Sequence, residues 1–230
     1  MILKKIELVL LVALICVTNV AIGQFNIKVG YTGGFMKAPD LNRIVDNFNT
    51  KYDKFSDQLD QFKSLHGLEL GLRYRIGSVG AELSWSNLTD NSDVITTLPT
   101  GTVLQDKWFL SMTEYSFGLE NYIGLFGYGA SIGYRTARMK TDIPQSRRKK
   151  QLITEESAFT NKFYLLFQAP GSKVSLVFKP YIQLPLGNIN VSGFDQGLNE
   201  QIDASYQAVR IQEERFFMYG ISILLYNGRQ

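Results

Sequence analysis

The segment FGYGASIGYR, residues 126–135, places an apolar or aromatic side chain at every second position. Successive side chains of a β-strand point to opposite faces, so this segment predicts a strand whose two faces meet different media. The alternate positions hold only glycine, serine and Arg135. The apolar set is Phe126, Tyr128, Ala130, Ile132 and Tyr134.

The same period of two recurs in seven further stretches, and the last three alternate less strictly. Together with residues 126–135 they predict eight strands. The seven stretches are Phe25–Phe35, Leu68–Ile76, Val79–Trp85, Tyr115–Leu119, Phe159–Phe167, Val174–Leu184 and Phe217–Leu225.

The connections between these stretches alternate in length, long then short. The short ones fall at 77–78, 122–124 and 169–172, and the long ones cover about 36–65, 87–107, 138–157 and 186–213. Short periplasmic turns and long outer loops are typical of bacterial outer-membrane barrels. Only helices and closed barrels satisfy every backbone hydrogen bond inside lipid. We therefore expect an all-β fold, an eight-stranded antiparallel up-and-down transmembrane β-barrel.

The first residues predict export. Lys4 and Lys5 precede the apolar run Leu8–Val17, and Ala21-Ile22-Gly23 offers the small residues that signal peptidase accepts. The run is shorter than the roughly 20 residues of a spanning helix, which argues against a retained anchor. We expect residues 1–23 to be a cleaved signal peptide and residues 24–230 to form one outer-membrane barrel domain of a Gram-negative bacterium.

The single cysteine, Cys16, lies within the expected signal peptide, so no disulfide or thiol chemistry is expected in the mature chain. Without that segment the chain carries 22 basic and 20 acidic residues, and this balance gives no indication of a nucleic-acid partner. No spacing of ligands suggests a metal ion or a cofactor.

The face opposite the apolar side chains mixes glycine and serine with charges of both signs. An eight-stranded barrel has an interior just wide enough for side chains to fill. We expect these charges to pair inside as a lumen network. They are Glu69, Arg73, Arg75, Glu82, Glu114, Glu120, Arg135, Lys162 and Lys179. The alternative, with aromatic residues inside and charges outside, describes a soluble periplasmic lipocalin-like ligand binder.

Three features of the sequence resemble small outer-membrane β-barrel proteins of Bacteroidetes, similar in architecture to OmpA and OmpX-type, porin-like barrels. They are the Gly23-Gln24 junction, the Tyr31–Gly34 end of the first strand, and the entry His66-Gly67-Leu68. The last strand resembles the C-terminal signal read by the barrel-assembly machinery, through Tyr219, Gly220, Ile223 and Leu225. The four residues 227–230 that follow depart from that pattern, which usually stops at an aromatic residue.

The first long connection predicts a helical insertion at about 40–65, because apolar residues recur there every three or four positions. Asp40 suits the N-cap, and Ser56 is suited to open a second helix. As a function, this apolar face is a candidate docking surface for a partner such as another outer-membrane protein. Structurally, the same stripe is accounted for if it lies on the barrel rim or caps the barrel mouth. The candidate docking residues are Leu41, Val45, Phe48, Tyr52, Phe55 and Leu59.

Two further features of the sequence are candidate sites. The basic run Arg147, Arg148, Lys149 and Lys150 is a candidate contact for lipopolysaccharide or an acidic glycan, although such runs are commonly solvated loop tips. His66, the only histidine, would be needed by a rim acyltransferase or protease. No motif surrounds it.

The function expected from the sequence is a non-enzymatic barrel without cofactors, whose outer loops bind or dock a partner or support the envelope. Its expected contacts are outer-membrane lipid, lipopolysaccharide and the assembly machinery. The alternatives are a narrow pore for small solutes, the lipocalin-like binder, and a rim enzyme that uses His66.

Overall fold

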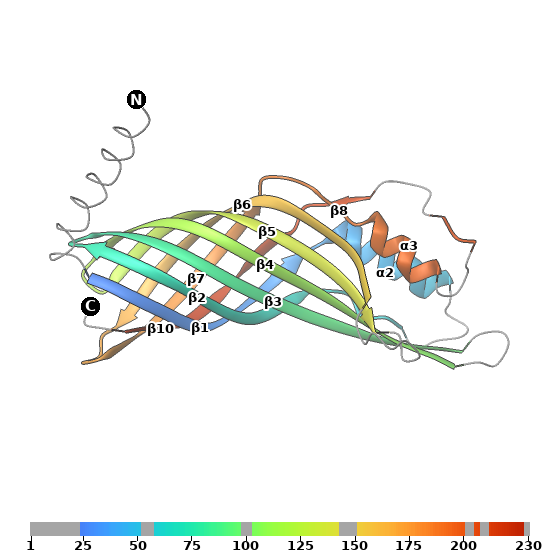
Figure 1. The fold of residues 1–230 in the computed structure, drawn as a ribbon, viewed down its shortest axis with the longest axis horizontal. Coiled ribbons are helices and arrows are strands. Elements are labelled where there is room, and N and C mark those ends of the chain that lie inside the picture. The colour runs from blue at the N-terminus through green and yellow to red at the C-terminus, as the bar shows by residue number, and fades with distance from the viewer. Residues whose placement is uncertain are drawn as a thin grey trace, which may run out of the picture.

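The computed structural model describes residues 24–51, 58–97, 103–142, 151–200, 205–207 and 212–227. The expected signal peptide, residues 1–23, lies outside the described residues. Eight antiparallel strands close on themselves in the order β1-β10-β7-β6-β5-β4-β3-β2 (Figure 1). The strands are β1 (Gln24–Lys37), β2 (Ser64–Ile76), β3 (Val79–Thr97), β4 (Val103–Ile123), β5 (Phe126–Asp142), β6 (Gln151–Ala169), β7 (Val174–Pro185) and β10 (Phe217–Asn227).

The expected fold class, an eight-stranded antiparallel up-and-down barrel with a helix after its first strand, is confirmed. The hydrogen-bonded register, followed once around the barrel from Asn26, returns to β1 at Met36, ten residues further along. This stagger tilts the strands and, with their number, fixes a narrow interior.

One end of the barrel carries the three short connections, and we call it the turn end. Gly77 and Gly124 stand in two of these turns with φ angles of 57° and 62°, in the left-handed region that glycine adopts without steric cost. β1 begins and β10 ends at the same end, as expected for an even number of strands. We call the opposite end, where both helices lie in Figure 1, the helical end.

Two of the expected long connections, 87–107 and 138–157, are wrong in extent. β3 continues to Thr97 and pairs with β4 from Val103, and β5 continues to Asp142 before β6 begins at Gln151. These extensions are ordered because their inward side chains, including Leu88 and Leu110, are buried in an apolar core.

The connection after β1 holds α2 (Pro39–Lys51), which is shorter than the helical insertion expected at 40–65. Residues 58–63 are described and are not helical, and the second helix expected from Ser56 would begin in residues outside the description. The last connection contains α3 (Ser192–Glu200) and a small sheet of β8 (Ile189–Asn190) and β9 (Glu213–Glu214), none of which the sequence predicted. Neither described helix is long and apolar enough to cross a membrane.

An apolar core fills the helical end, and we call it the cap core. Phe194 of α3 lies edge-on to Trp108 of β4, with ring centroids 5.1 Å apart, and to Phe62, at 6.1 Å. The core joins segments that are distant in the sequence. Its buried members are Met36, Ala38, Leu41, Ile44, Val45, Phe48, Leu59, Phe62, Leu65, Leu88, Trp108, Leu110, Met112, Ala137, Met139, Ala158, Ile189, Val191, Phe194, Leu198, Phe216 and Met218.

Replacing Phe194 by alanine is expected to loosen the cap core while the barrel stays closed. Removal of a buried phenylalanine costs about 3–5 kcal/mol of stability, because the cavity it leaves closes only in part. Limited proteolysis across a urea series should show earlier cleavage near α2 and α3. The matched control Phe163→Ala removes the same side chain from the half-exposed outer face of β6, where little change is expected. Equal cleavage of the two variants would contradict the role of Phe194.

Candidate functional site

The barrel interior centres on two lysines and two glutamates that alternate in space, here called the central cluster. Lys28 Nζ lies 2.7 Å from Glu69 Oε1 and 2.7 Å from Glu82 Oε1. Lys179 Nζ lies 2.7 Å from Glu82 Oε1 and 3.6 Å from Glu69 Oε1. All four side chains are buried. Two positive and two negative charges therefore neutralise each other in the middle of the barrel.

Hydroxyl groups complete the coordination of these carboxylates. Thr32 and Ser222 each donate a hydrogen bond of 2.9 Å to Glu69 Oε2, and they also contact each other. Glu82 accepts a hydrogen bond from the Ser84 hydroxyl at 2.8 Å and another from the Tyr226 hydroxyl at 3.3 Å. A buried carboxylate is expensive unless its lone pairs are satisfied, and here both carboxylates have several donors.

A second group of charges lies between the central cluster and the cap core. Glu114 accepts from Arg135 Nε at 3.1 Å, and Lys162 Nζ lies 3.1 Å from its other oxygen. Thr160 donates to Glu114 at 3.1 Å, and Gln183 donates to the same oxygen. One buried carboxylate thus holds two buried cations.

The third group lies toward the turn end. Arg73 donates to Asn26 and to the hydroxyl of Tyr122, each at 2.7 Å, and Tyr122 donates to Glu120 at 2.5 Å. The guanidinium of Arg73 also lies 4.3 Å from the ring centroid of Tyr226. Arg73 is therefore bound through Tyr122 to the Glu120 carboxylate on one side and packs on the aromatic ring of Tyr226 on the other.

The structure places eight of the nine expected lumen charges inside and brings all eight into these three groups. In the third group Arg73 and Glu120 are linked through the hydroxyl of Tyr122. The ninth, Arg75, is only partly buried, donates to the carbonyl of Gly77 at 2.8 Å and lies at the turn end. The sequence prediction missed Lys28, although it stands on the polar side of the first alternation. It also missed the inward tyrosines, which occupy the polar alternation of their strands: Tyr122, Tyr164, Tyr181 and Tyr226.

The described part of the candidate docking face in the first connection is not exposed. Leu41, Val45, Phe48 and Leu59 are buried in the cap core, so their prediction as docking residues is corrected: they close the barrel mouth. Tyr52 and Phe55, the other two, lie outside the described residues.

Glu214 of β9 holds the start of α2. Its Oε2 accepts hydrogen bonds from the backbone amides of Asp40 at 2.7 Å and Leu41 at 3.0 Å, groups that have no partner within the helix. Burial raises the pKa of Glu214, and hydrogen bonds from the amides of Leu41, Arg215 and Asp40 oppose that shift. The carboxylate also meets the positive end of the helix dipole, so it ties α2 to the last connection.

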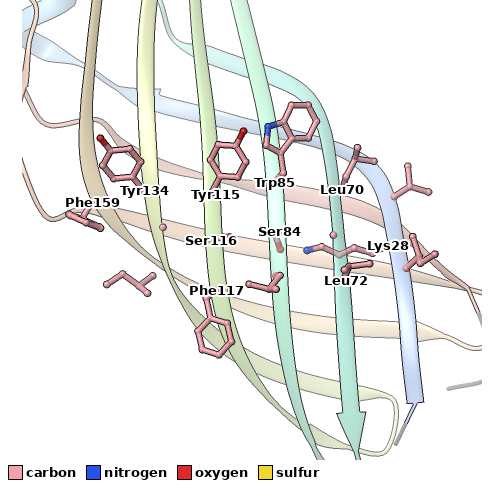
Figure 2. Close-up of a pocket in the computed structure, with 16 residues that line it drawn as sticks. Lys28, Leu70, Leu72, Ser84, Trp85, Tyr115, Ser116, Phe117, Tyr134 and Phe159 are labelled. Atoms are coloured by element: carbon pink, nitrogen blue, oxygen red, sulfur yellow. The ribbon is translucent and has the colours of Figure 1, made fainter. Parts of the chain in front are cut away.

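The outside of the barrel is an apolar belt. Figure 2 shows Trp85, Tyr115 and Tyr134 on neighbouring strands at one level, and Leu72 and Phe117 at the next level down. The registers align the upper row as Val29, Leu70, Trp85, Tyr115, Tyr134 and Phe159 across six strands. Between the two rows runs a shallow hollow of about 780 Å³ whose lining is almost wholly apolar. We call this hollow the girdle groove.

The apolar side chains change faces along single strands. On β4, Trp108, Leu110 and Met112 are buried, whereas Tyr115, Phe117 and Leu119 are exposed. The pairing of β4 with β5 has no irregularity between Lys107 and Ile123, so no bulge causes the change. The same hairpin therefore carries its apolar residues inward near the helical end and outward nearer the turn end. We call the level between Met112 and Tyr115 the crossover.

Arg147, Arg148, Lys149 and Lys150 lie outside the described residues. The expected assembly signal is part of β10, where Tyr219, Ile223 and Leu225 point outward and Gly220 points inward. His66 is exposed on the outer face of β2 and stacks on Tyr31, with ring centroids 6.0 Å apart. Within the described part of the chain it makes no hydrogen bond to a hydroxyl or carboxylate.

These observations define a class of protein: a closed eight-stranded up-and-down β-barrel with an apolar outer belt, an ion-paired interior and a helical cap. Neither a protein-family model nor a curated protein matches the sequence. Among solved structures the chain is similar to Neisserial surface protein A, with a TM-score of 0.47 and 8% identity over 89% of this chain and 97% of that one. It is also similar to Ail, the attachment invasion locus protein of Yersinia pestis, with a TM-score of 0.43 and 12% identity over 88% and 98%.

Replacing Glu114 by leucine is expected to destabilise the barrel by about 3–5 kcal/mol, because Arg135 and Lys162 are then buried without a counter-charge. The matched control is Glu155→Leu. Glu155 pairs with Arg138 across β5 and β6 but is well exposed, and such pairs contribute about 0–1 kcal/mol. Urea titrations followed by the shift between folded and unfolded gel mobility measure both. Similar urea midpoints for the two variants would contradict the prediction that the buried cations Arg135 and Lys162 need Glu114 for stability.

Proposed function

We propose that this protein is an integral outer-membrane β-barrel without enzymatic activity, whose helical end faces outward and provides binding surfaces or envelope support. The crossover on β4 and β5 carries the proposal. Side chains that are apolar outside and ionic inside suit a barrel in lipid, and the reverse pattern beyond the crossover suits a barrel in water.

The height of the belt supports this placement. On β4 the outward-apolar positions run from Tyr115 to Ile123 and on β5 from Phe126 to Tyr134, nine residues in each case, with Asn121 as the polar exception on β4. A tilted transmembrane strand needs about 9–11 residues. Aromatic residues at the upper edge match the girdle that such barrels place at the membrane interface.

The direction of insertion follows from the two ends. Outer-membrane barrels have short periplasmic turns and larger extracellular connections. We therefore assign the turn end to the periplasm and the cap core, with the hairpins that surround it, to the cell exterior. The Bacteroidetes origin suggested by the sequence remains a prediction.

The filled interior argues against the pore alternative. Three groups of charged side chains and the cap core above them occupy the lumen, and the girdle groove lies on the outer wall. In planar bilayers the protein is expected to give no steady channels. Stable single-channel steps from purified protein would overturn this and favour the solute conduit. The lipocalin-like alternative requires charges outside along the whole barrel, whereas between the crossover and the turn end the paired charges lie inside and the apolar side chains outside.

The absence of enzymatic activity is proposed from the position of His66. Acyl transfer or proteolysis needs a nucleophile within hydrogen-bond reach of its base. His66 instead packs on Tyr31 on the outer wall. Because the described residues of the predicted docking face are buried, we assign binding to the polar outer faces beyond the crossover. The basic run 147–150 stays a proposed contact for lipopolysaccharide or an acidic glycan.

The membrane placement is tested by arginine substitutions on the outer face of one strand. Phe117→Arg lies in the proposed lipid zone and should cost about 2–4 kcal/mol of stability, whereas an arginine near the interface costs about 0–1 kcal/mol. The matched control Ser111→Arg stands on the same face of β4 beyond the crossover. Folding into phospholipid vesicles across a urea series, read by heat-modifiable gel mobility, measures both. Equal tolerance of the two arginines would contradict the crossover as the edge of the membrane.

A further inference from the structure

A second hollow in the outer wall is centred on β1 and β10. It measures about 750 Å³ and spans β2, β1, β10 and β7, with an almost wholly apolar lining. Its floor includes Gly33, Gly34 and Gly220, and its walls include Phe35 and Tyr219, whose ring centroids are 5.6 Å apart. We call it the Gly33 hollow.

Gly33 is a glycine that the folded chain does not itself require. A Cβ built on it would meet no atom within 4 Å, and it lacks the positive φ that favours glycine. Its neighbours differ: a Cβ on Gly34 would lie 2.5 Å from the Tyr181 hydroxyl, and one on Gly220 would lie 2.1 Å from the Gly33 carbonyl oxygen. Glycine inside a strand weakens it, and often marks close approach by a ligand. Because position 33 carries no side chain, the outer wall of the barrel is hollowed there, on the side that faces the proposed lipid.

Two cations, Lys37 and Arg215, lie near one edge of the hollow. Lys37 is paired in register with Phe217, a lining residue, and its Nζ lies 5.9 Å from the Phe217 ring centroid. Lys37 and the exposed Arg215 also line a polar hollow of about 490 Å³ at the helical end. Lys37 therefore stands where the apolar hollow gives way to the polar one.

The carboxylates of the polar hollow are already engaged. Asp40 pairs with Arg43 at 2.7 Å, Glu213 accepts from Asn188, and Glu214 accepts from the backbone at the start of α2. Among the described residues, neither Lys37 nor Arg215 takes part in an ion pair. Arg215 donates from Nε to Asn188, which leaves the other guanidinium nitrogens available. The net effect is a pair of available cations beside an apolar trough.

We propose that the Gly33 hollow binds one lipopolysaccharide molecule, with an acyl chain lying over Gly33 and a phosphate between Lys37 and Arg215. This inference rests on the proposed outer-membrane placement, which puts the helical end in the leaflet that carries lipopolysaccharide. An apolar trough beneath two cations fits an anionic amphiphile, because a neutral lipid would leave the cations unused and a soluble anion would leave the trough empty. Arginine and lysine are the side chains suited to phosphate.

The test is lipid retention, measured by native mass spectrometry. The full-length mature protein, folded in detergent, is incubated with equimolar rough lipopolysaccharide and phosphatidylglycerol, and a parallel sample receives dephosphorylated lipopolysaccharide. The wild type is expected to keep one lipopolysaccharide. Gly33→Leu should lower retention by about tenfold or more, since displacing an acyl chain removes the burial of several methylenes.

Charge reversal and a matched control separate the two halves of the site. Lys37→Glu with Arg215→Glu should lower retention of the phosphorylated form and leave the dephosphorylated form little changed. Ala130→Leu places the same leucine side chain on the exposed outer face of β5, away from the hollow, and should retain lipid as the wild type does. If Gly33→Leu does not fold, Gly33→Ala and the charge-reversed variant carry the test.

Several outcomes would overturn the proposal: no retained lipid, retention of phosphatidylglycerol instead, a dimer with its hollow filled by a second copy, or equal retention by Gly33→Leu and Ala130→Leu. Heat-modifiable mobility in phospholipid vesicles is recorded for every variant. A wild type that fails to insert refutes the membrane placement, whereas one that inserts but retains no lipopolysaccharide refutes only this inference.

Discussion

The narrowness of the interior is the constraint on which the rest of the structure depends. With apolar side chains outside, the alternate residue of each strand must point inward, and eight strands leave room only for groups that fit and neutralise each other. Lys28 and Lys179 with Glu69 and Glu82 meet this condition by mutual pairing. A slip of one residue in any strand would move its charges into the outer belt, so the same charges also fix the register.

That constraint ends at the crossover. Beyond it, strands β3, β4 and β5 carry apolar side chains that point inward, and α2 and α3 cover these side chains. This part of the interior therefore resembles the core of a small soluble domain. The cap core and the ionic interior therefore lie on the same strands. The inward side chains change from apolar to charged within a few residues. Glu114 and Met112, two positions apart on β4, stand on either side of this change.

The part of the fold below the crossover was predictable because period two is a local signal, and all eight expected strands are present. The extensions were missed because Thr89, Asp90, Asn91 and Asp93 give a polar stretch typical of a loop, while their support comes from residues far along the chain. The change of phase from Trp108-Leu110-Met112 to Tyr115-Phe117 was visible in the sequence and is the signal for the crossover. The pairing of particular charges was not predictable, since it depends on the ten-residue stagger around the barrel.

The girdle groove and the Gly33 hollow differ in whether packing inside the barrel requires their glycines. This difference indicates which of the two hollows binds a lipid. In the girdle groove, a Cβ on Gly71 would lie 2.4 Å from the carbonyl oxygen of Leu83 and 2.5 Å from Lys28, and one on Gly133 would meet Thr160 and Glu114 within 3.0 Å. Packing inside the barrel accounts for both glycines, so the groove is the space between two rows of outward side chains. Gly33 points outward and meets nothing, and two cations lie above its hollow. Shape, unexplained glycine and charge therefore coincide only in the Gly33 hollow, which makes it the stronger candidate for a lipid held in one position.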